Sequence, residues 1–217
     1  MRLEQALGAG RTRMLAAISH DLRTPITSLR IRAEFIEDAE LQAKILATLD
    51  EMQAMTEATL GFAREDATEE TFQETDLSAL CKSVVADAAD IDKDASFQAP
   101  EGTRVVVSCR PIALRRALRN IVDNALAYGG RARVAVERSA DAVVIVIDDD
   151  GPGIPDSDQA RVFEPFVRLE ESRNRETGGI GLGMAIARTI LRAHGGDVEL
   201  KNRPEGGLRV RLLLPTD

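Results

Sequence analysis

The first part of the chain repeats hydrophobic residues with the period of an α-helix. One apolar set recurs at spacings of three and four residues: Leu15, Ile18, Leu22, Ile26 and Leu29. A second set follows a predicted turn at 38–40: Leu41, Ile45, Leu49, Met52 and Thr56. A single helical hairpin would leave these faces in water, so we expect two chains to pair as a dimeric four-helix bundle.

The remainder of the chain mixes strand and helix patterns. Short apolar runs predict strands at 104–108, 132–138, 142–148, 197–202 and 208–214. Amphipathic stretches predict helices that end near 89, 128 and 194. Asp76 or Ser78 would cap the first of these helices, Pro111 would open the second and Gly129-Gly130 would end it. This grouping indicates an α+β fold, a sandwich with helices on one face of a mixed sheet.

Between these two parts lies an acidic stretch. Residues 65–76 hold six acidic and no basic residues, which is typical of a solvated linker. The predicted organisation is therefore a helical hairpin over 1–66, a linker over 67–76 and a second domain over 77–217.

Composition narrows the function classes. The net charge of -8 and an aromatic content of only 3% argue against a nucleic-acid-binding protein. The longest apolar run, Ala142 to Ile147, is too short to span a membrane, and no signal peptide precedes the first helix, so we expect a cytoplasmic chain. Cys81 and Cys109 lack metal-type spacing and are expected to be small buried thiols.

His20 lies on the first predicted helix, roughly 160° from the centre of the apolar stripe. Asp21 is its neighbour in sequence, and Thr24 follows one turn later on the same face. An exposed imidazole beside a carboxylate is a plausible nucleophile. A surface histidine on a coiled coil is the alternative interpretation.

A line of polar side chains follows the predicted helix that Pro111 opens. Asn120, Asn124 and Tyr128 are spaced by four residues along the edge of its apolar face. Two half-buried amides need partners, and their carbonyl oxygens suit a hard cation such as Mg²⁺. The alternative is a helix surface that happens to carry asparagine.

Two glycine-rich segments complete the candidate chemistry. Asp149 follows the most hydrophobic strand, and Gly151 and Gly153 would let a purine approach the backbone, although an ordinary turn has the same pattern. Residues 178–183 precede a helix, where free N–H groups favour phosphate. A P-loop, a Rossmann fingerprint and the protein-kinase motif set are all absent from the sequence.

In this order, the motifs resemble those of the sensor histidine kinases of two-component signalling. The matching segments are Ser19–Pro25 (phosphoacceptor box), Asn120–Ala125 (asparagine box), Asp149–Gly153 and Gly179–Gly183 (glycine boxes), and Phe163–Phe166 (phenylalanine box). The resemblance implies a dimerisation and phosphotransfer bundle, followed by an ATP-binding domain of the gyrase, heat-shock chaperone and MutL type.

The resemblance also implies roles for individual residues. His20 would be phosphorylated, Asp21 would orient or deprotonate its imidazole, and Thr24 would position water for dephosphorylating a partner. Asn120 and Asn124 would hold Mg²⁺ and the phosphates of ATP, and Asp149 would accept from the adenine amino group. A lid over 155–177 would be anchored by Phe163 and Phe166. The remaining implied nucleotide contacts are Tyr128, Gly151, Gly153, Arg168, Arg173, Gly179, Gly181 and Gly183.

Two further expectations follow from the residues around the lid and the last helix. Ala127 stands where the family often has a basic residue, so an arginine of the lid, such as Arg168 or Arg173, would contact phosphate in its place. His194 is expected at a helix end, favoured there by the helix dipole.

The implied partners are a second copy of the chain and the receiver domain of a response regulator. Contact with a membrane would come only through segments absent from this chain, as in the cytoplasmic part of an inner-membrane sensor. Three alternatives stay open: a chain that acts mainly as a phosphatase, a non-catalytic dimeric scaffold, and a chaperone-like or mismatch-repair-like ATPase.

Overall fold

The computed structural model describes residues 24–65, 70–90, 93–98, 104–138, 142–169 and 181–216, with the side chains of residue 51 and of 54–65 excepted. The chain divides into two compact units, Met1–Glu69 and Glu70–Asp217. Each unit is described by itself. Within the described residues, no helix is both long and apolar enough to cross a membrane.

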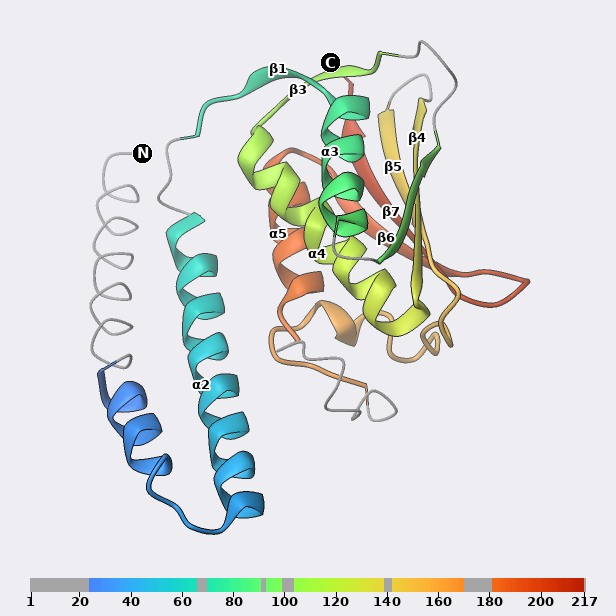
Figure 1. The fold of residues 1–217 in the computed structure, drawn as a ribbon. Helices are drawn as coiled ribbons and strands as arrows, with labels where there is room; N and C mark the ends of the chain where they lie inside the picture. The colour runs from blue at the N-terminus through green and yellow to red at the C-terminus, as the bar shows by residue number, and fades with distance from the viewer. Residues whose placement is uncertain are drawn as a thin grey trace. The chain divides into compact units, whose positions relative to one another are not determined.

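In the first unit, helical residues 24–33 lead through a turn at 34–38 into α2 (Ala39–Glu65) (Figure 1). The turn was predicted at 38–40 and lies a few residues earlier, because Asp38 is the N-terminal cap of α2. Its carboxylate accepts the N–H groups of Glu40 and Leu41 at 3.0 and 3.1 Å. This satisfies donors that the first helical turn leaves without partners.

The core of the hairpin contains part of each predicted stripe. Its buried members are Ile26, Ala33 and Leu49, with Ile36, Ile45 and Leu46 packed against them. Other members of the stripes face solvent in the single chain: Leu29, Leu41 and Met52 are each close to half exposed. Leu15, Ile18, Leu22 and the side chain of Thr56 lie outside the described residues.

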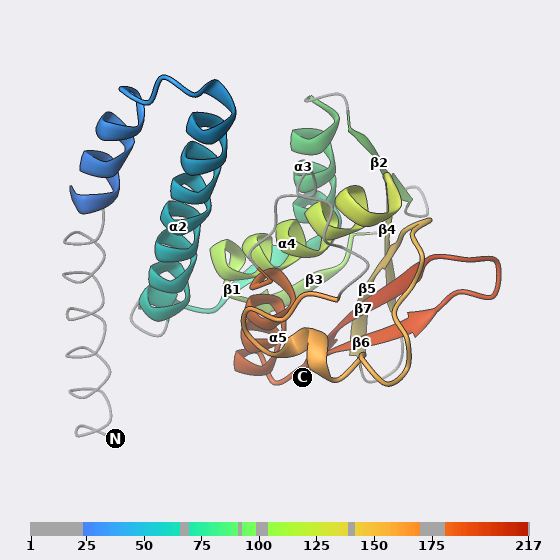
Figure 2. The same cartoon turned by 90° about the horizontal axis from the view of Figure 1, so that it is seen from below.

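The second unit is the expected α+β sandwich. A five-stranded sheet has the order β2 (Asp94–Gln98), β4 (Arg131–Arg138), β5 (Ala142–Asp148), β7 (Leu208–Pro215), β6 (Asp197–Asn202). β2 runs parallel to β4, and the other neighbours are antiparallel. Helices α3 (Leu77–Ala89), α4 (Pro111–Gly129) and α5 (Gly183–Ala193) cover one face of this sheet (Figures 1 and 2).

Local signals account for the ends of these helices. Asp76 caps α3 by accepting from the N–H groups of Ser78 and Ala79. Pro111 occupies the first turn of α4, and Gly130 ends that helix with a φ of 68°. The core lies between helices and sheet, and its fully buried members include Leu114, Leu118 and Ile121 of α4, Ile145 and Ile147 of β5, Leu191 of α5 and Leu212 of β7.

The acidic stretch is only partly a linker. Residues 73–76 form β1 (Gln73–Asp76), which pairs antiparallel with β3 (Val106–Cys109) in a separate two-stranded sheet. Glu70 and Phe72 also belong to the second unit. All side chains of β1 are polar and are exposed or half-buried. Neither an apolar run nor an alternation of apolar and polar residues therefore marks this segment as a strand.

Candidate nucleotide-binding site

Asp149 stands directly after β5, the most deeply buried strand of the sheet. Its side chain is buried, and its Oδ1 accepts the N–H groups of Gly151 at 2.8 Å and Leu208 at 2.9 Å. Burial raises the pKa of Asp149, and these two hydrogen bonds oppose that rise. Within the described ranges no donor hydrogen-bonds Oδ2, which leaves this second carboxylate oxygen as an acceptor.

The glycines after Asp149 are required by the packing of the protein itself. A Cβ on Gly151 would lie 2.9 Å from the carbonyl oxygen of Tyr128, at the end of α4. Gly153 has a φ of +74°, and a Cβ there would lie 2.6 Å from Oδ1 of Asn202. These contacts bring the end of α4 and the side chain of Asn202 against the loop that follows Asp149.

The predicted polar line on α4 is present. Asn120 and Asn124 are half-buried, and Tyr128 is exposed near the end of the helix. The amides face the first turn of α5, since a Cβ on Gly183 would lie 3.4 Å from Nδ2 of Asn124 and 3.6 Å from Cβ of Asn120. Nδ2 of Asn120 is buried and has no hydrogen-bond partner among the described residues. A buried amide without a partner is costly, so a polar group from outside the protein fits here.

The first turn of α5 offers backbone N–H groups in the same place. Leu182 occupies the N-cap position, and its side chain makes no hydrogen bond to the N–H groups of this turn. Unpaired N–H groups and the helix dipole favour an anion. A metal ion at this site would need amide or phosphate oxygens, because the described residues contain no group of three or more His, Cys, Asp or Glu suited to a metal.

The start of the predicted lid is held by one of its two phenylalanines. Phe163, in the short helix η1 (Arg161–Phe163), lies 4.3 Å from the guanidinium of Arg188, which in turn binds Asp197. The expectation for the Phe166 ring is wrong, because that side chain is exposed. Phe166 is instead held through its backbone: it has a φ of 66°, and its N–H donates to the carbonyl oxygen of Gly181 at 3.0 Å.

Gly181 is required where it stands. It has a φ of +76°, and a Cβ there would lie 2.7 Å from the carbonyl oxygen of Val167. Arg168, which follows Val167 in the sequence, is exposed.

Several predicted site residues lie outside the described part of the chain, namely His20, Asp21, Arg173 and Gly179. Thr24 is the first described residue of the hairpin; it is helical and exposed, which suits a side chain on the face opposite the apolar stripe.

His194 lies at the predicted helix end, as the C-cap residue of α5. Its side chain is buried there. Nε2 accepts the N–H of Arg110 at 2.9 Å, and Nδ1 lies 2.7 Å from the carbonyl oxygen of Ile190. Since a carbonyl only accepts, Nδ1 donates, and the ring has the hydrogen-bonding pattern of a neutral tautomer. The Phe72 ring packs against it with centroids 5.3 Å apart.

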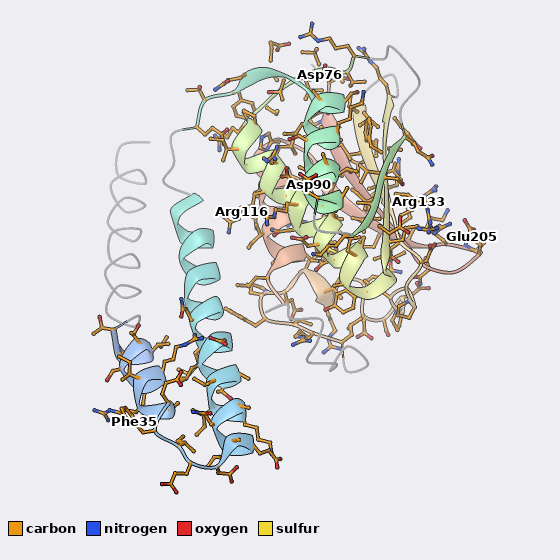
Figure 3. All side chains as sticks on the ribbon, in the orientation of Figure 1. Phe35, Asp76, Asp90, Arg116, Arg133 and Glu205 are labelled. Atoms are coloured by element: carbon orange, nitrogen blue, oxygen red, sulfur yellow. The ribbon has the colours of Figure 1, made fainter. Side chains whose placement is uncertain are left out.

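A cluster of charged residues around the end of β5 was not predicted. Asp148 binds Arg209 of β7 through two hydrogen bonds of 2.7 and 2.6 Å, and Asp150 binds Arg133 of β4, also through two. The Arg133 guanidinium is the main reason that the pKa of Asp150 is held well below its usual range. In Figure 3, Arg133 and Glu205 lie at the same end of the sheet. Sequence reasoning could have found this cluster only with the strand register in hand. The register of β4, β5 and β7 places Arg133 and Arg209 opposite Asp148.

Comparisons with known proteins agree with this arrangement. Residues 109–217 match the family model described as histidine kinase-, DNA gyrase B- and HSP90-like ATPase, and residues 10–68 match the His Kinase A (phospho-acceptor) domain. The ATP-binding domain of PrrB from Mycobacterium tuberculosis superimposes with a TM-score of 0.56 at 30% identity, over 68% of this chain and 98% of that one.

Two curated relatives match nearly all of the chain. The sensor histidine kinase GtrS of Pseudomonas aeruginosa is 42% identical over 205 residues, which is 94% of this chain and 42% of GtrS. The sensor histidine kinase CpxA of Escherichia coli is 34% identical over 213 residues, covering 94% of this chain and 46% of CpxA. The chain thus spans less than half the length of each. With a phospho-acceptor domain followed by an ATP-binding domain, the chain belongs to the sensor histidine kinases of two-component signalling.

Proposed function

We propose that this chain is an ATP-dependent protein-histidine kinase. It phosphorylates itself on His20 and passes the phosphoryl group to an aspartate in the receiver domain of a response regulator. The unit Met1–Glu69 carries the phosphoacceptor and the dimer contacts, and the unit Glu70–Asp217 binds ATP.

One observation carries the proposal: the elements of a nucleotide site lie along α4, at its middle and at its C-terminal end. Towards its middle, Asn120 and Asn124 face the uncapped first turn of α5. At its end, the carbonyl of Tyr128 packs against the loop of Asp149, whose Oδ2 is unused by the described residues. The asparagine acceptors for a cation on α4 thereby lie close to donors for phosphate on α5, and the end of α4 lies close to the acceptor for a base after β5.

Each group has a part in binding Mg²⁺-ATP. Asp149 accepts from the adenine amino group, and the carbonyl oxygens of Asn120 and Asn124 hold Mg²⁺, which neutralises phosphate charge when it is bound. The remaining contacts come from residues that frame the nucleotide: Tyr128, Gly151, Gly153, Arg168, Arg173, Gly179, Gly181 and Gly183. The orphaned amide of Asn120 supports this, because a bound phosphate oxygen would supply its missing acceptor.

The transfer itself is mainly a matter of positioning. The imidazole of His20 attacks the γ-phosphorus, an N–P bond forms as the bond to the bridging oxygen of ADP breaks, and ADP leaves. Asp21 orients the imidazole and accepts the proton that its other ring nitrogen loses. Thr24 positions water in the reverse function, the dephosphorylation of the regulator; its exposed place on the hairpin supports that role.

The hairpin acts as a homodimer in this proposal. Leu29, Leu41 and Met52 are large apolar residues close to half exposed in a single chain, and a second hairpin would cover them. A chain that works mainly as a phosphatase, or as a non-catalytic scaffold, would use the same dimer. Such a chain would not accumulate phosphohistidine.

The experiment that tests the nucleotide site compares two substitutions on α4. With Mg²⁺ and γ-labelled ATP, Asn124→Ala should lower the initial labelling rate at least about tenfold, since one positioned ligand is worth about 1.4 kcal/mol or more. Arg119→Ala is the matched control, because Arg119 is an exposed residue of the same helix that pairs with Asp123. Equal rates for wild type, Asn124→Ala and Arg119→Ala would contradict the proposal.

A further inference from the structure

The turn that joins β6 to β7, together with Leu208, the first residue of β7, hydrogen-bonds Asp149. Leu208 donates its N–H to Oδ1 of Asp149 at 2.9 Å and accepts the N–H of Asp149 on its carbonyl oxygen at 3.0 Å. Arg203 donates from Nη1 to the carbonyl oxygen of Asp149 at 2.6 Å. The turn and Leu208 therefore hold the backbone N–H, the backbone carbonyl and one carboxylate oxygen of Asp149. Its fourth polar atom, Oδ2, is the one that the proposed function assigns to adenine.

The turn has a backbone that permits this close approach. Gly207 has a φ of +93°, and a Cβ there would collide with the carbonyl oxygen of Asp149. The turn is closed by the N–H of Arg203, which donates to the carbonyl oxygen of Gly207 at 2.9 Å. Arg203 and Gly207 thus stand opposite each other in the turn, and both contact the same carbonyl group.

The guanidinium of Arg203 is held on several sides. Its side chain is only 12% exposed. Nη2 donates to Glu205 at 2.7 Å, and Nη1 also reaches Asp150 at 3.1 Å. Nε lies 3.9 Å from Oδ2 of Asp148 without a hydrogen bond. A planar fork with donors in fixed directions can serve a main-chain carbonyl and two separate carboxylates at once, whereas a lysine ammonium cannot occupy all three places.

We propose that Arg203 is a positioning residue of the nucleotide site: it fixes the backbone of Asp149 so that Oδ2 keeps the orientation in which it accepts from the adenine amino group. The inference rests on the proposed role of Asp149. Arg203 itself need not touch the nucleotide.

Arg203 also affects the charge of Asp149. The acidic group that acts on that carboxylate is Asp150, and the basic ones are Arg133 and Arg203. Arg209 binds Asp148, and Glu205 binds Arg203. The positive charge of Arg203 opposes the rise in the pKa of Asp149 that burial causes. Without that charge the carboxylate would become protonated at a higher pH.

The test is calorimetric titration of the full chain with ADP and with IDP, in Mg²⁺, between pH 5 and pH 8. IDP carries a carbonyl oxygen in place of the adenine amino group. Arg203→Met should weaken ADP binding about tenfold at pH 7.5, reduce the ADP-over-IDP preference, and move the acid limb of ADP binding to higher pH. Arg203→Lys should also lose preference for ADP but keep the wild-type acid limb, because it keeps the charge.

The matched control is Arg211→Met, which breaks a surface ion pair with Glu199 on the same two strands. It should leave both affinities and the pH profile unchanged. Wild-type affinity, base preference and acid limb in Arg203→Met would overturn the inference. If Arg203→Met does not fold, Arg203→Lys decides: a reduced ADP-over-IDP preference supports the inference, and a wild-type preference overturns it. A wild-type chain that binds no ADP would overturn the proposed function together with the inference.

Discussion

The carboxylate of Glu70 caps the N-terminus of α4 through Ile112. Oε1 accepts the N–H of Ile112 at 2.7 Å, and Oε2 accepts the N–H of Ala113 at 3.1 Å. Arg110, at the cap position itself, makes no side-chain hydrogen bond to the helix. The segment that follows the hairpin unit thus completes the helix on which the asparagine pair stands.

Replacing this cap should destabilise the second unit. Glu70→Ala is expected to lower its free energy of unfolding by about 1 kcal/mol, since it leaves two N–H groups and a helix dipole without their anion. Urea unfolding followed by the fluorescence of Tyr128, the one tyrosine of the chain, reports on this unit. Glu74→Ala removes an exposed acid of β1 and is the control. Equal stability of the two variants would show that Glu70 is not a cap.

The thiols provide a second test. Both cysteines are free and buried, and burial raises the pKa of Cys81 to about 12 and also raises that of Cys109. Neither should react with a disulfide reagent at pH 8 until denaturant is added, because the thiolate is the reactive form. Ser108→Cys places a thiol at an exposed position of β3 and should react at once. Rapid reaction of a wild-type thiol would contradict this burial.

Asp197 should make stability depend on pH. Its carboxylate binds Arg188 and Arg192, and the bond to Arg188 is the main reason that its pKa lies well below its ordinary range. Its contribution is therefore complete above pH 4 to 5, above the unfolded pKa of about 3.9, and is lost as pH falls through the lower folded pKa.

Asp197→Asn should accordingly lower the Tm at pH 7, with a difference from wild type that shrinks as the pH falls below about 4. A Tm difference that is the same at pH 7 and pH 3 would mean that the ionised carboxylate is not the source of the stabilisation.

Asp149→Asn tests the direction of the adenine contact. Oδ1 accepts two backbone N–H groups, so an asparagine would keep its oxygen there and place its amide NH₂ where Oδ2 stood. Two donors would then face each other, and the ratio of ADP to IDP affinity should fall at least about tenfold. Asp156→Asn, at an exposed position of the same loop, should leave the ratio unchanged. An unaltered ratio in Asp149→Asn would place the adenine elsewhere.

Sequence reasoning succeeded where the signal is local. α3, α4 and β5 were predicted to within a few residues because Asp76, Pro111 and Gly130 mark helix ends and because β5 is apolar almost throughout. The position of Asn120 and Asn124 on one face of α4 was predicted from their spacing of four residues.

It failed where the determinant is a partner far along the chain. β1 is polar and exists only by pairing with β3, and Glu70 caps a helix forty-two residues away. The helix end at His194 was predicted, but the burial of its side chain depends on Arg110, which donates its N–H to Nε2. Arg203 carries no pattern of its own; its contact with Asp149 depends on how β6, β7 and the loop after β5 come together.

The central claim is that His20 accepts phosphate from ATP, and labelling tests it most directly. The chain and its His20→Gln variant would be incubated with Mg²⁺ and γ-labelled ATP, and the label's stability in acid and in base would be measured. We predict a label on the wild-type chain that is lost in acid, stable in base and absent from His20→Gln. An unlabelled wild-type chain that still binds ATP, or equal labelling of His20→Gln, would contradict the account.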